Sequence, residues 1–316
     1  MSTLVTGASG YIGRVLCHEL ASKGYSVKGV GRTSSAFMGF DYAAVDLESA
    51  EMYELVKGRD CIVHLAGRAH VLGEIESISG DIYRKANSDL SIRLVQASID
   101  AGVKRFVFIS SIGVNGSHTN DRPFSESSSP DPQTPYAISK YTAENELRKL
   151  VSTSPMELVV IRPPLVYAGE APGNFSRLMK LVSIGLPLPF GAVKNARSMI
   201  ALGNLVDFIQ VCMFHPAAAN ELFVVADNQN FSTPEIVRYL AQGMGKDVIL
   251  LPFFDSPMRG FLSLMGKKTI YIQLYGSLVI DSGKAKSLLG WTPPFDPRQC
   301  LIDAGRFFKT NAGKRN

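Results

Sequence analysis

The segment VTGASGYIG, residues 5–13, places Gly7, Gly10 and Gly13 between a short β-branched stretch and an amphipathic one. Residues 3–6 are typical of a buried strand, and residues 11–23 have the apolar spacing of a helix. In such a unit Gly7 allows a tight turn, Gly10 lets the backbone approach a pyrophosphate, and Gly13 lets helix and strand pack closely. The helix N-terminus adds amide donors and the positive end of a dipole. The segment therefore predicts a dinucleotide-binding turn rather than a glycine-rich turn without a ligand.

The rest of the first half continues to alternate strand and helix patterns. Strands are expected at residues 26–30, about 43–47, 61–67, 105–111 and 157–163, and longer helices at about 81–101 and 136–151. This alternation predicts an α/β fold with a parallel, doubly wound sheet of the Rossmann type. After Pro163 glycine and proline become frequent, and residues 232–245 form a separate helical pattern with Ser232 or Thr233 as its cap.

We therefore expect two domains, the second smaller, C-terminal and partly interleaved with the first. Residues 1–163 plus about 197–226 would form the dinucleotide-binding domain. Residues about 164–196 plus 227–316 would form the substrate-binding domain.

Composition excludes several other classes of function. The net charge is +5, but Lys and Arg are spread along the 316 residues, so we expect pockets for phosphate groups and no nucleic-acid partner. No apolar run approaches the ~18 residues of a membrane span, and the first residues do not resemble a signal peptide. The four cysteines and five histidines are scattered. We expect a cytoplasmic protein with reduced thiols, no metal site and no membrane insertion.

The end of the second expected strand, VKGVGRTSS, bears on the choice of cofactor. An acid at this point binds the ribose 2′-hydroxyl of NAD, whereas an arginine accommodates the 2′-phosphate of NADP. Gly31 stands where the acid is expected, and Arg32 follows it, with Ser34 and Ser35 nearby. This favours NADP(H) as the cofactor, with NAD(H) possible. Asp46 and Leu47, at the end of the third expected strand, are candidates for contact with the adenine.

Tyr136 and Lys140, in the segment TPYAISKYTAEN, lie one turn apart on one face of an expected helix. A nearby ammonium lowers the pKa of a phenol, ordinarily about 10, and so makes a tyrosine a usable general acid or base. Such a pair is common by chance, so it needs support. Ser110 and Ser111 provide it, because they follow a strand at the edge where open α/β sheets bind ligands.

Two further polar residues lie near this edge in the sequence. His64 falls within the strand that ends in HLAG, and we interpret it as a packed histidine rather than a catalyst. Asn87, on the following helix, is placed to hold a water molecule or Lys140.

With these segments in order, the chain resembles an extended short-chain dehydrogenase/reductase of the nucleotide-sugar type. The resemblance covers nearly the whole length and rests on TGASGYIG, HLAG, SSIGVNG and YAISK. It implies a catalytic set of Ser111, Tyr136 and Lys140, supported by Asn87. Ser111 is preferred over Ser110 because it precedes Val114 by three residues, although Asn115 replaces the tyrosine usual after that valine. The resemblance also implies that Tyr11, Ile12, Leu65 and Ala66 lie in the cofactor site.

The resemblance extends to the second half of the chain, where it implies a UDP-sugar substrate with Asn174 and Arg197 on its diphosphate. Within this family the segments around Ser111 and Arg197 are similar to those of reductases that act on UDP-4-keto-6-deoxy-N-acetylglucosamine. Such an enzyme uses NAD(P)H to reduce the C4 keto group, giving UDP-N-acetylquinovosamine for bacterial O-antigen and other surface polysaccharides. The alternative is a UDP-hexose or UDP-N-acetylhexosamine 4-epimerase that retains NAD. A remote alternative is a dinucleotide sensor without catalysis. By analogy with the family, we expect a homodimer.

Overall fold

A parallel sheet of seven strands forms the centre of the molecule, in the order β3-β2-β1-β4-β5-β6-β9. The computed structural model describes residues 1–33, 39–68, 80–252 and 268–312, so Ser34 and Ser35 lie outside the described residues. The strands are β1 (Ser2–Thr6), β2 (Ser26–Gly31), β3 (Asp41–Ala44), β4 (Cys61–His64), β5 (Arg105–Ile109), β6 (Glu157–Arg162) and β9 (Leu222–Val224). The predicted doubly wound α/β fold is confirmed.

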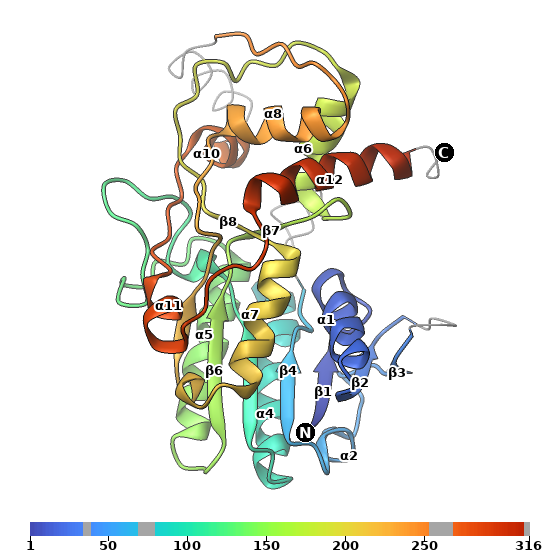
Figure 1. The fold of residues 1–316 in the computed structure, drawn as a ribbon. Coiled ribbons are helices and arrows are strands. Elements are labelled where there is room, and N and C mark those ends of the chain that lie inside the picture. The colour runs from blue at the N-terminus through green and yellow to red at the C-terminus, as the bar shows by residue number, and fades with distance from the viewer. Residues whose placement is uncertain (34–38, 69–79, 253–267, 313–316) are drawn as a thin grey trace.

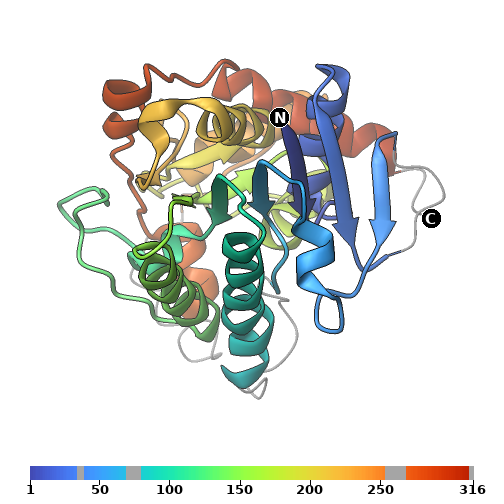
Figure 2. The same ribbon diagram turned by 90° about the horizontal axis from the view of Figure 1, so that it is seen from below.

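Helices cover both faces of the sheet (Figures 1 and 2). One face carries α1 (Tyr11–Ser22), α7 (Leu202–Phe214) and α11 (Gly283–Leu289), and the other carries α2 (Met52–Val56), α4 (Leu90–Asp100) and α5 (Pro135–Val151). Successive strand residues point to opposite faces, so Val5 packs under α1 and α7 while Leu4 packs under α4 and α5. Because both faces are covered, the central strands β4 and β5 are buried at every residue.

The helix expected over residues 81–101 is divided in the structure. It consists of α3 (Gly80–Tyr83), a π-helical segment (Arg84–Asp89) and α4. A π segment inserts an extra residue into a helix and is often found at functional sites. Asn87 lies within it.

A second, smaller region sits above the carboxyl ends of the strands (Figure 1). It contains the two-stranded sheet of β7 (Leu165–Tyr167) and β8 (Met199–Ala201), with α6 (Gly173–Ile184), α8 (Thr233–Gly243), α10 (Lys268–Tyr275) and α12 (Pro297–Ala312). Helix α8 begins with a capping box in which Ser232 accepts from the Glu235 amide and Glu235 accepts from the Ser232 amide, so Ser232 is the cap. These elements share a core of their own.

The chain passes more than once between the two regions. After β8 it returns to the sheet through α7 and β9. It returns again near the C-terminus, where Ala285, Leu289 and Trp291 pack into the core of the sheet and the Trp291 indole donates to Asp207 (2.8 Å). The division into two domains stays a prediction, and residues 285–291 pack with the first of them.

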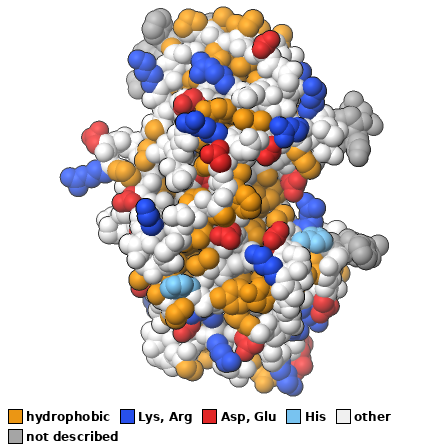
Figure 3. All heavy atoms as spheres, in the orientation of Figure 1, with side chains coloured by type: hydrophobic (Ala, Val, Ile, Leu, Met, Phe, Trp, Pro, Cys, Tyr) orange, Lys and Arg blue, Asp and Glu red, His pale blue; other side chains and the backbone are white. Residues whose placement is uncertain are grey.

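On the face seen in Figure 3, Lys and Arg side chains are interspersed with Asp and Glu, so the positive net charge is not gathered there. Across the ranges that the structure describes, no helix has the length and apolar character needed to cross a bilayer. The same ranges hold no cluster of three or more metal-ligating side chains of the His, Cys, Asp or Glu type. All four cysteines are free thiols, and Cys17, Cys61 and Cys212 are buried.

Candidate active site

The glycine turn between β1 and α1 is shaped for the close approach of a ligand. Gly7 has φ +71°, and a Cβ there would lie 2.7 Å from the Ala66 amide nitrogen. A Cβ on Gly13 would lie 2.2 Å from the Gly7 carbonyl oxygen, so only glycine lets α1 pack against this turn. Gly10 is the N-cap residue of α1 and has no side-chain hydrogen bond at the cap. The amides at the start of α1 therefore face a position where a pyrophosphate could bind.

Residues next to this turn fit the same use. Tyr11 and Ile12 open α1, and the Tyr11 hydroxyl is buried with no hydrogen-bond partner in the described part of the chain. Leu65 and Ala66 follow β4 and lie against the turn, because the Leu65 amide donates to the Thr6 carbonyl (3.2 Å) and the Ala66 amide to the Thr6 hydroxyl (3.2 Å). A glycine cradle, a helix N-terminus and an unsatisfied buried hydroxyl together fit a dinucleotide.

At the end of β2, two hydroxyl groups lie close to Gly31, which stands where an acid was expected. A Cβ on Gly31 would lie 2.5 Å from the Ser9 hydroxyl oxygen and 3.0 Å from the Tyr42 hydroxyl oxygen. The Ser9 side chain therefore occupies the space that an acidic side chain on Gly31 would need. Arg32 is exposed at this edge, and within the described residues no carboxylate forms an ion pair with it.

Strand β3 ends earlier than expected, so Asp46 and Leu47 lie in the turn that follows it. Asp46 is exposed and accepts from the Glu48 amide (3.0 Å). The Leu47 side chain is 6% exposed and packs in the core beneath α2. The contact of Asp46 and Leu47 with an adenine stays a prediction.

The two serines after β5 have different surroundings. Ser110 is 3% exposed and donates to the Glu144 carboxylate (2.5 Å). Ser111 accepts from the Gly113 amide (3.1 Å), and its hydroxyl forms a hydrogen bond with Tyr136 that acts to lower the tyrosine pKa. The structure thus brings Ser111, and not Ser110, to the phenol, in keeping with the sequence-based choice.

Helix α5 presents Tyr136 and Lys140, with Thr134 as its cap and Pro135 in its first turn. The Lys140 ammonium donates to the Ile109 carbonyl (2.9 Å) and lies 4.6 Å from the centre of the Phe108 ring. Burial lowers the pKa of Lys140 to about 8, and the nearby charge of Glu144 acts against this decrease.

The expected low pKa of Tyr136 is wrong for this arrangement. Burial raises the pKa of Tyr136 to about 12, and neither the hydrogen bond from Ser111 nor the spacing to Lys140 offsets it. The reason is that desolvation acts on the phenol, while the ammonium is turned toward the Ile109 carbonyl. At neutral pH Tyr136 therefore holds its proton, as a general acid must.

Asn87 is fully buried and joins three segments of the site. Its amide oxygen accepts from the Arg68 amide (2.8 Å), and its amide nitrogen donates to the Arg68 carbonyl (3.1 Å) and to the Ser139 hydroxyl (2.9 Å). A Cβ on Gly67 would lie 2.8 Å from the Asn87 amide oxygen and 3.5 Å from the Lys140 nitrogen. Asn87 thus fixes the loop after β4 beside Lys140, with Gly67 leaving the room.

The expected diphosphate ligands lie in the smaller region. Asn174 is in the first turn of α6 and donates to the Gln273 side chain on α10. Arg197 donates to the Gly276 carbonyl (3.2 Å), and its backbone pairs with Phe231. Burial lowers the pKa of Arg197 to about 10, so the guanidinium remains charged at neutral pH. No carboxylate in the described ranges pairs with it, so this half-buried cation can accept an anionic ligand.

Three residues of the site were missed by sequence reasoning. Gly67 is the residue whose missing side chain makes room for Asn87 and Lys140, and the Tyr83 ring lies 6.3 Å from that of Tyr136. Glu144 lies one helical turn after Lys140 and is fully buried. A signal was available for Glu144, because it shares the helix face of Tyr136 and Lys140 at i+4 spacing.

A glycine turn for a dinucleotide, with Ser111 after β5 and with Tyr136 and Lys140 on α5 beside it, is the arrangement of an enzyme of the short-chain dehydrogenase/reductase type. The chain belongs to the NAD dependent epimerase/dehydratase family, whose sequence profile matches residues 3–226. It is therefore an enzyme of that family, and the remote alternative of a sensor without catalysis loses its basis.

Individual relatives agree with this assignment. The chain is 40% identical to a UDP-glucose 4-epimerase of Vibrio cholerae over 93% of this chain and 91% of the relative. It is 28% identical to an N-acetyl-alpha-D-glucosaminyl-diphospho-ditrans,octacis-undecaprenol 4-epimerase of Escherichia coli O157:H7, over 78% and 73% of the two chains. In fold it is similar to a UDP-glucuronic acid 4-epimerase of Bacillus cereus solved with UDP-glucuronic acid and NAD (TM-score 0.80, 20% identity, 98% and 99% covered).

Proposed function

We propose that the protein catalyses oxidation and reduction at C4 of a UDP-sugar, and that its reaction is 4-epimerisation of a UDP-hexose or UDP-N-acetylhexosamine. The observation that carries the proposal is the Ser111–Tyr136 hydrogen bond beside Lys140, at the sheet edge that also holds the glycine turn. The 40% identity with a UDP-glucose 4-epimerase supports epimerisation over the reductase reading favoured by sequence resemblance.

The chemistry assigned to the chain's own residues is a proton transfer at the C4 oxygen. Tyr136 holds its proton at neutral pH and can donate it to that oxygen, while Ser111 donates a hydrogen bond to charge developing on it. For the reverse transfer the hydrogen bond from Ser111 favours the phenolate. The nicotinamide cofactor supplies and receives the hydride when bound. The residues proposed to hold it are those of the glycine turn, with Tyr11, Ile12, Leu65, Ala66 and Lys140.

The substrate proposal rests on Arg197. Within the described residues the Arg197 guanidinium donates to one acceptor, the Gly276 carbonyl, so donors are left for a diphosphate, and its planar fork matches phosphate oxygens. Asn174 is proposed as a second ligand, which requires it to exchange its bond to Gln273 for one to the diphosphate. Arg197→Ala should therefore weaken binding of UDP by about tenfold or more, a loss of at least ~1.4 kcal/mol. Isothermal titration with UDP checks this, and unchanged affinity would contradict the proposed subsite.

A second candidate, NADPH-dependent reduction of UDP-4-keto-6-deoxy-N-acetylglucosamine, is favoured by one specific observation. Gly31 stands where an acid would read the ribose 2′-hydroxyl, the Ser9 hydroxyl lies beside it, and Arg32 is exposed next to it. A reductase consumes reduced cofactor in every turnover and gains from binding NADPH, whereas an epimerase recycles NAD. Under this candidate the product would be UDP-N-acetylquinovosamine for a surface polysaccharide.

One experiment separates the two candidates. Purified protein is given UDP-glucose, UDP-N-acetylglucosamine or UDP-4-keto-6-deoxy-N-acetylglucosamine, with NAD or NADPH, and products are resolved by mass spectrometry and NMR. Epimerisation without net loss of NADPH supports the first proposal. Stoichiometric oxidation of NADPH with the keto substrate, without epimerisation of the other two sugars, would replace it with the second. Turnover of none of these sugars would refute both.

We further propose that the enzyme acts as a cytoplasmic homodimer. The proposal rests on the analogy with the family, and light scattering coupled to size exclusion tests the dimer. A monomeric mass at working concentrations would refute it.

A further inference from the structure

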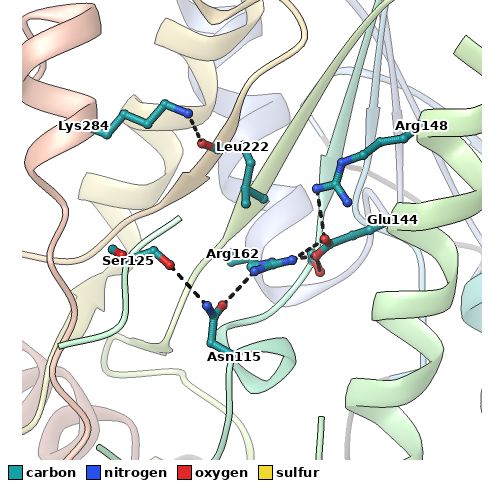
Figure 4. Close-up of polar contacts among 8 residues, drawn as sticks. Asn115, Ser125, Glu144, Arg148, Arg162, Leu222 and Lys284 are labelled. Atoms are coloured by element: carbon teal, nitrogen blue, oxygen red, sulfur yellow. Dashed lines mark hydrogen bonds and ion pairs between the residues drawn. The ribbon is translucent and has the colours of Figure 1, made fainter. Parts of the chain in front are cut away.

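A buried carboxylate lies directly behind the catalytic residues. Glu144 is on α5, one turn beyond Lys140, and its side chain is fully buried. Arg162, at the end of β6, binds both of its oxygens, through Nε (2.8 Å) and Nη2 (2.6 Å). Arg148 and Ser110 also donate to it, at 3.2 Å and 2.5 Å. Figure 4 shows the two arginines converging on this carboxylate from different elements.

The same network binds the loop of Ser111 at two points, one before Ser111 in the chain and one after it. Ser110 precedes the catalytic serine, and Asn115 follows it at the end of the short helical turn 112–114. The Asn115 amide oxygen accepts from Arg162 Nη1 (2.9 Å), and its amide nitrogen donates to the Ser125 carbonyl (3.3 Å). Thus the asparagine that replaces the family's usual tyrosine is the far end of a chain of contacts that begins at Glu144.

Packing alone does not explain a charge at this position. A buried ion pair contributes little net stability, because the cost of removing both charges from water offsets their attraction, and apolar residues of similar volume often serve as well. What distinguishes the position of Glu144 is its neighbour. The Lys140 ammonium is buried beside the Phe108 ring, and Glu144 is the charged side chain that favours its protonated form.

The other titratable groups around Lys140 do not supply a negative charge. His64, on the neighbouring strand β4, is held neutral, because burial lowers its pKa to about 3. Tyr136, one turn earlier on α5, is also neutral at pH 7. Among the described residues that face Lys140, Glu144 therefore supplies the negative charge.

We propose that Glu144 is a positioning residue of the active site, which keeps Lys140 charged and, with Arg162 and Ser110, fixes the Ser111 loop against α5. The catalytic use of this arrangement rests on the proposed function. The effect of Glu144 on the charge of Lys140 can be tested without a sugar substrate. Lys140 is also proposed to hold the cofactor, and cofactor binding can be measured in the absence of a sugar.

The test measures the affinity for NADH by fluorescence across the pH range from about 6 to 10. In the wild type we expect the affinity to fall at alkaline pH as Lys140 loses its proton, and Lys140→Met should remove this decrease. In Glu144→Gln the decrease should occur about one pH unit lower, since loss of a nearby opposite charge changes a pKa by roughly that amount or more. The matched control is Glu146→Gln, because Glu146 is on the same helix but half-exposed and paired with Lys149 (2.7 Å).

An alkaline decrease at the same pH in Glu144→Gln and wild type would overturn the proposal and leave Glu144 as a structural brace. If Glu144→Gln does not fold, Arg148→Gln decides. Arg148 is partly exposed and shares the Glu144 carboxylate, so its removal should raise the pH of the decrease. An unchanged or lower pH in that variant overturns the proposal. If the proteins turn over no UDP-sugar but these shifts are observed, the proposed function fails and the role of Glu144 stands.

Discussion

The buried histidine of β4 should make this protein lose stability in mild acid. His64 is fully buried, and its hydrogen bonds are complete for a neutral ring. The Thr6 hydroxyl lies 2.6 Å from Nδ1 and the Ser91 hydroxyl 2.9 Å from Nε2, while Ser91 donates to the Asn87 carbonyl (2.5 Å). If Thr6 donates to Nδ1 and Nε2 donates to Ser91, each hydroxyl proton has an acceptor. A second proton on the ring would leave the Thr6 proton without one.

The size of the effect follows from the two pKa values of His64. Burial, followed by the charge of Lys140, lowers the folded-state pKa to about 3, whereas the unfolded chain should have ~6.5. Below ~6.5 the unfolded state binds the proton that the folded state refuses, so stability falls as pH falls. Near pH 5 the loss is about 2 kcal/mol. A folded-state value one unit higher would leave this loss almost unchanged, because it would still be well below pH 5.

The assay is urea unfolding at pH 7.5 and pH 5, at fixed protein concentration, for wild type and His64→Gln. Glutamine retains a hydrogen-bonding amide but does not titrate. Its change in unfolding free energy between the two pH values should therefore be about 2 kcal/mol smaller than that of the wild type. Comparing each protein with itself removes any constant cost of the substitution. His118→Gln, at an exposed histidine, is the control. Equal pH dependence in wild type and His64→Gln would refute the reasoning.

Three further predictions concern the site. Tyr136→Phe should reduce turnover by ~10²–10⁴-fold with little change in cofactor affinity, since only the proton donor is lost; a loss below about tenfold in steady-state assays would contradict its role. Arg32→Ala should weaken NADPH by ~1.5–3 kcal/mol more than NADH, and an unchanged ratio in fluorescence titrations would make Arg32 a surface residue. Gly31→Asp should weaken the binding of both cofactors, because its Cβ would lie 2.5 Å from the Ser9 hydroxyl oxygen. The double variant Ser9→Gly with Gly31→Asp should bind NADH in preference to NADPH. Equal cofactor affinities in the single and double variants would show that Ser9 does not obstruct this position.

The fold was predictable because its signals are local. The central strands of the sheet are short and buried on both faces, each crossover helix has its own apolar stripe, and the glycine turn lies between the first strand and the first helix. The interruption of the helix at Asn87 was not predictable in this way. A π segment has no distinctive local composition here, and the contacts of Asn87 with Arg68 and Ser139 join segments far apart in the chain.

The same difference between local and distant interactions explains the catalytic pair. The spacing of Tyr136 and Lys140 places their Cβ atoms together, because residues four apart share a helix face. It does not determine which way the ammonium turns, since the Ile109 carbonyl and the Phe108 ring belong to a strand 31 residues away from Lys140 along the chain.

The spacing also does not determine the charge of either side chain. Burial by other elements lowers the pKa of Lys140 and raises the pKa of Tyr136. A sequence motif can therefore identify the acid and the cation. The charge of the cation depends further on Glu144, whose carboxylate is bound by Arg162 from the end of another strand, a contact that the spacing within α5 does not reveal.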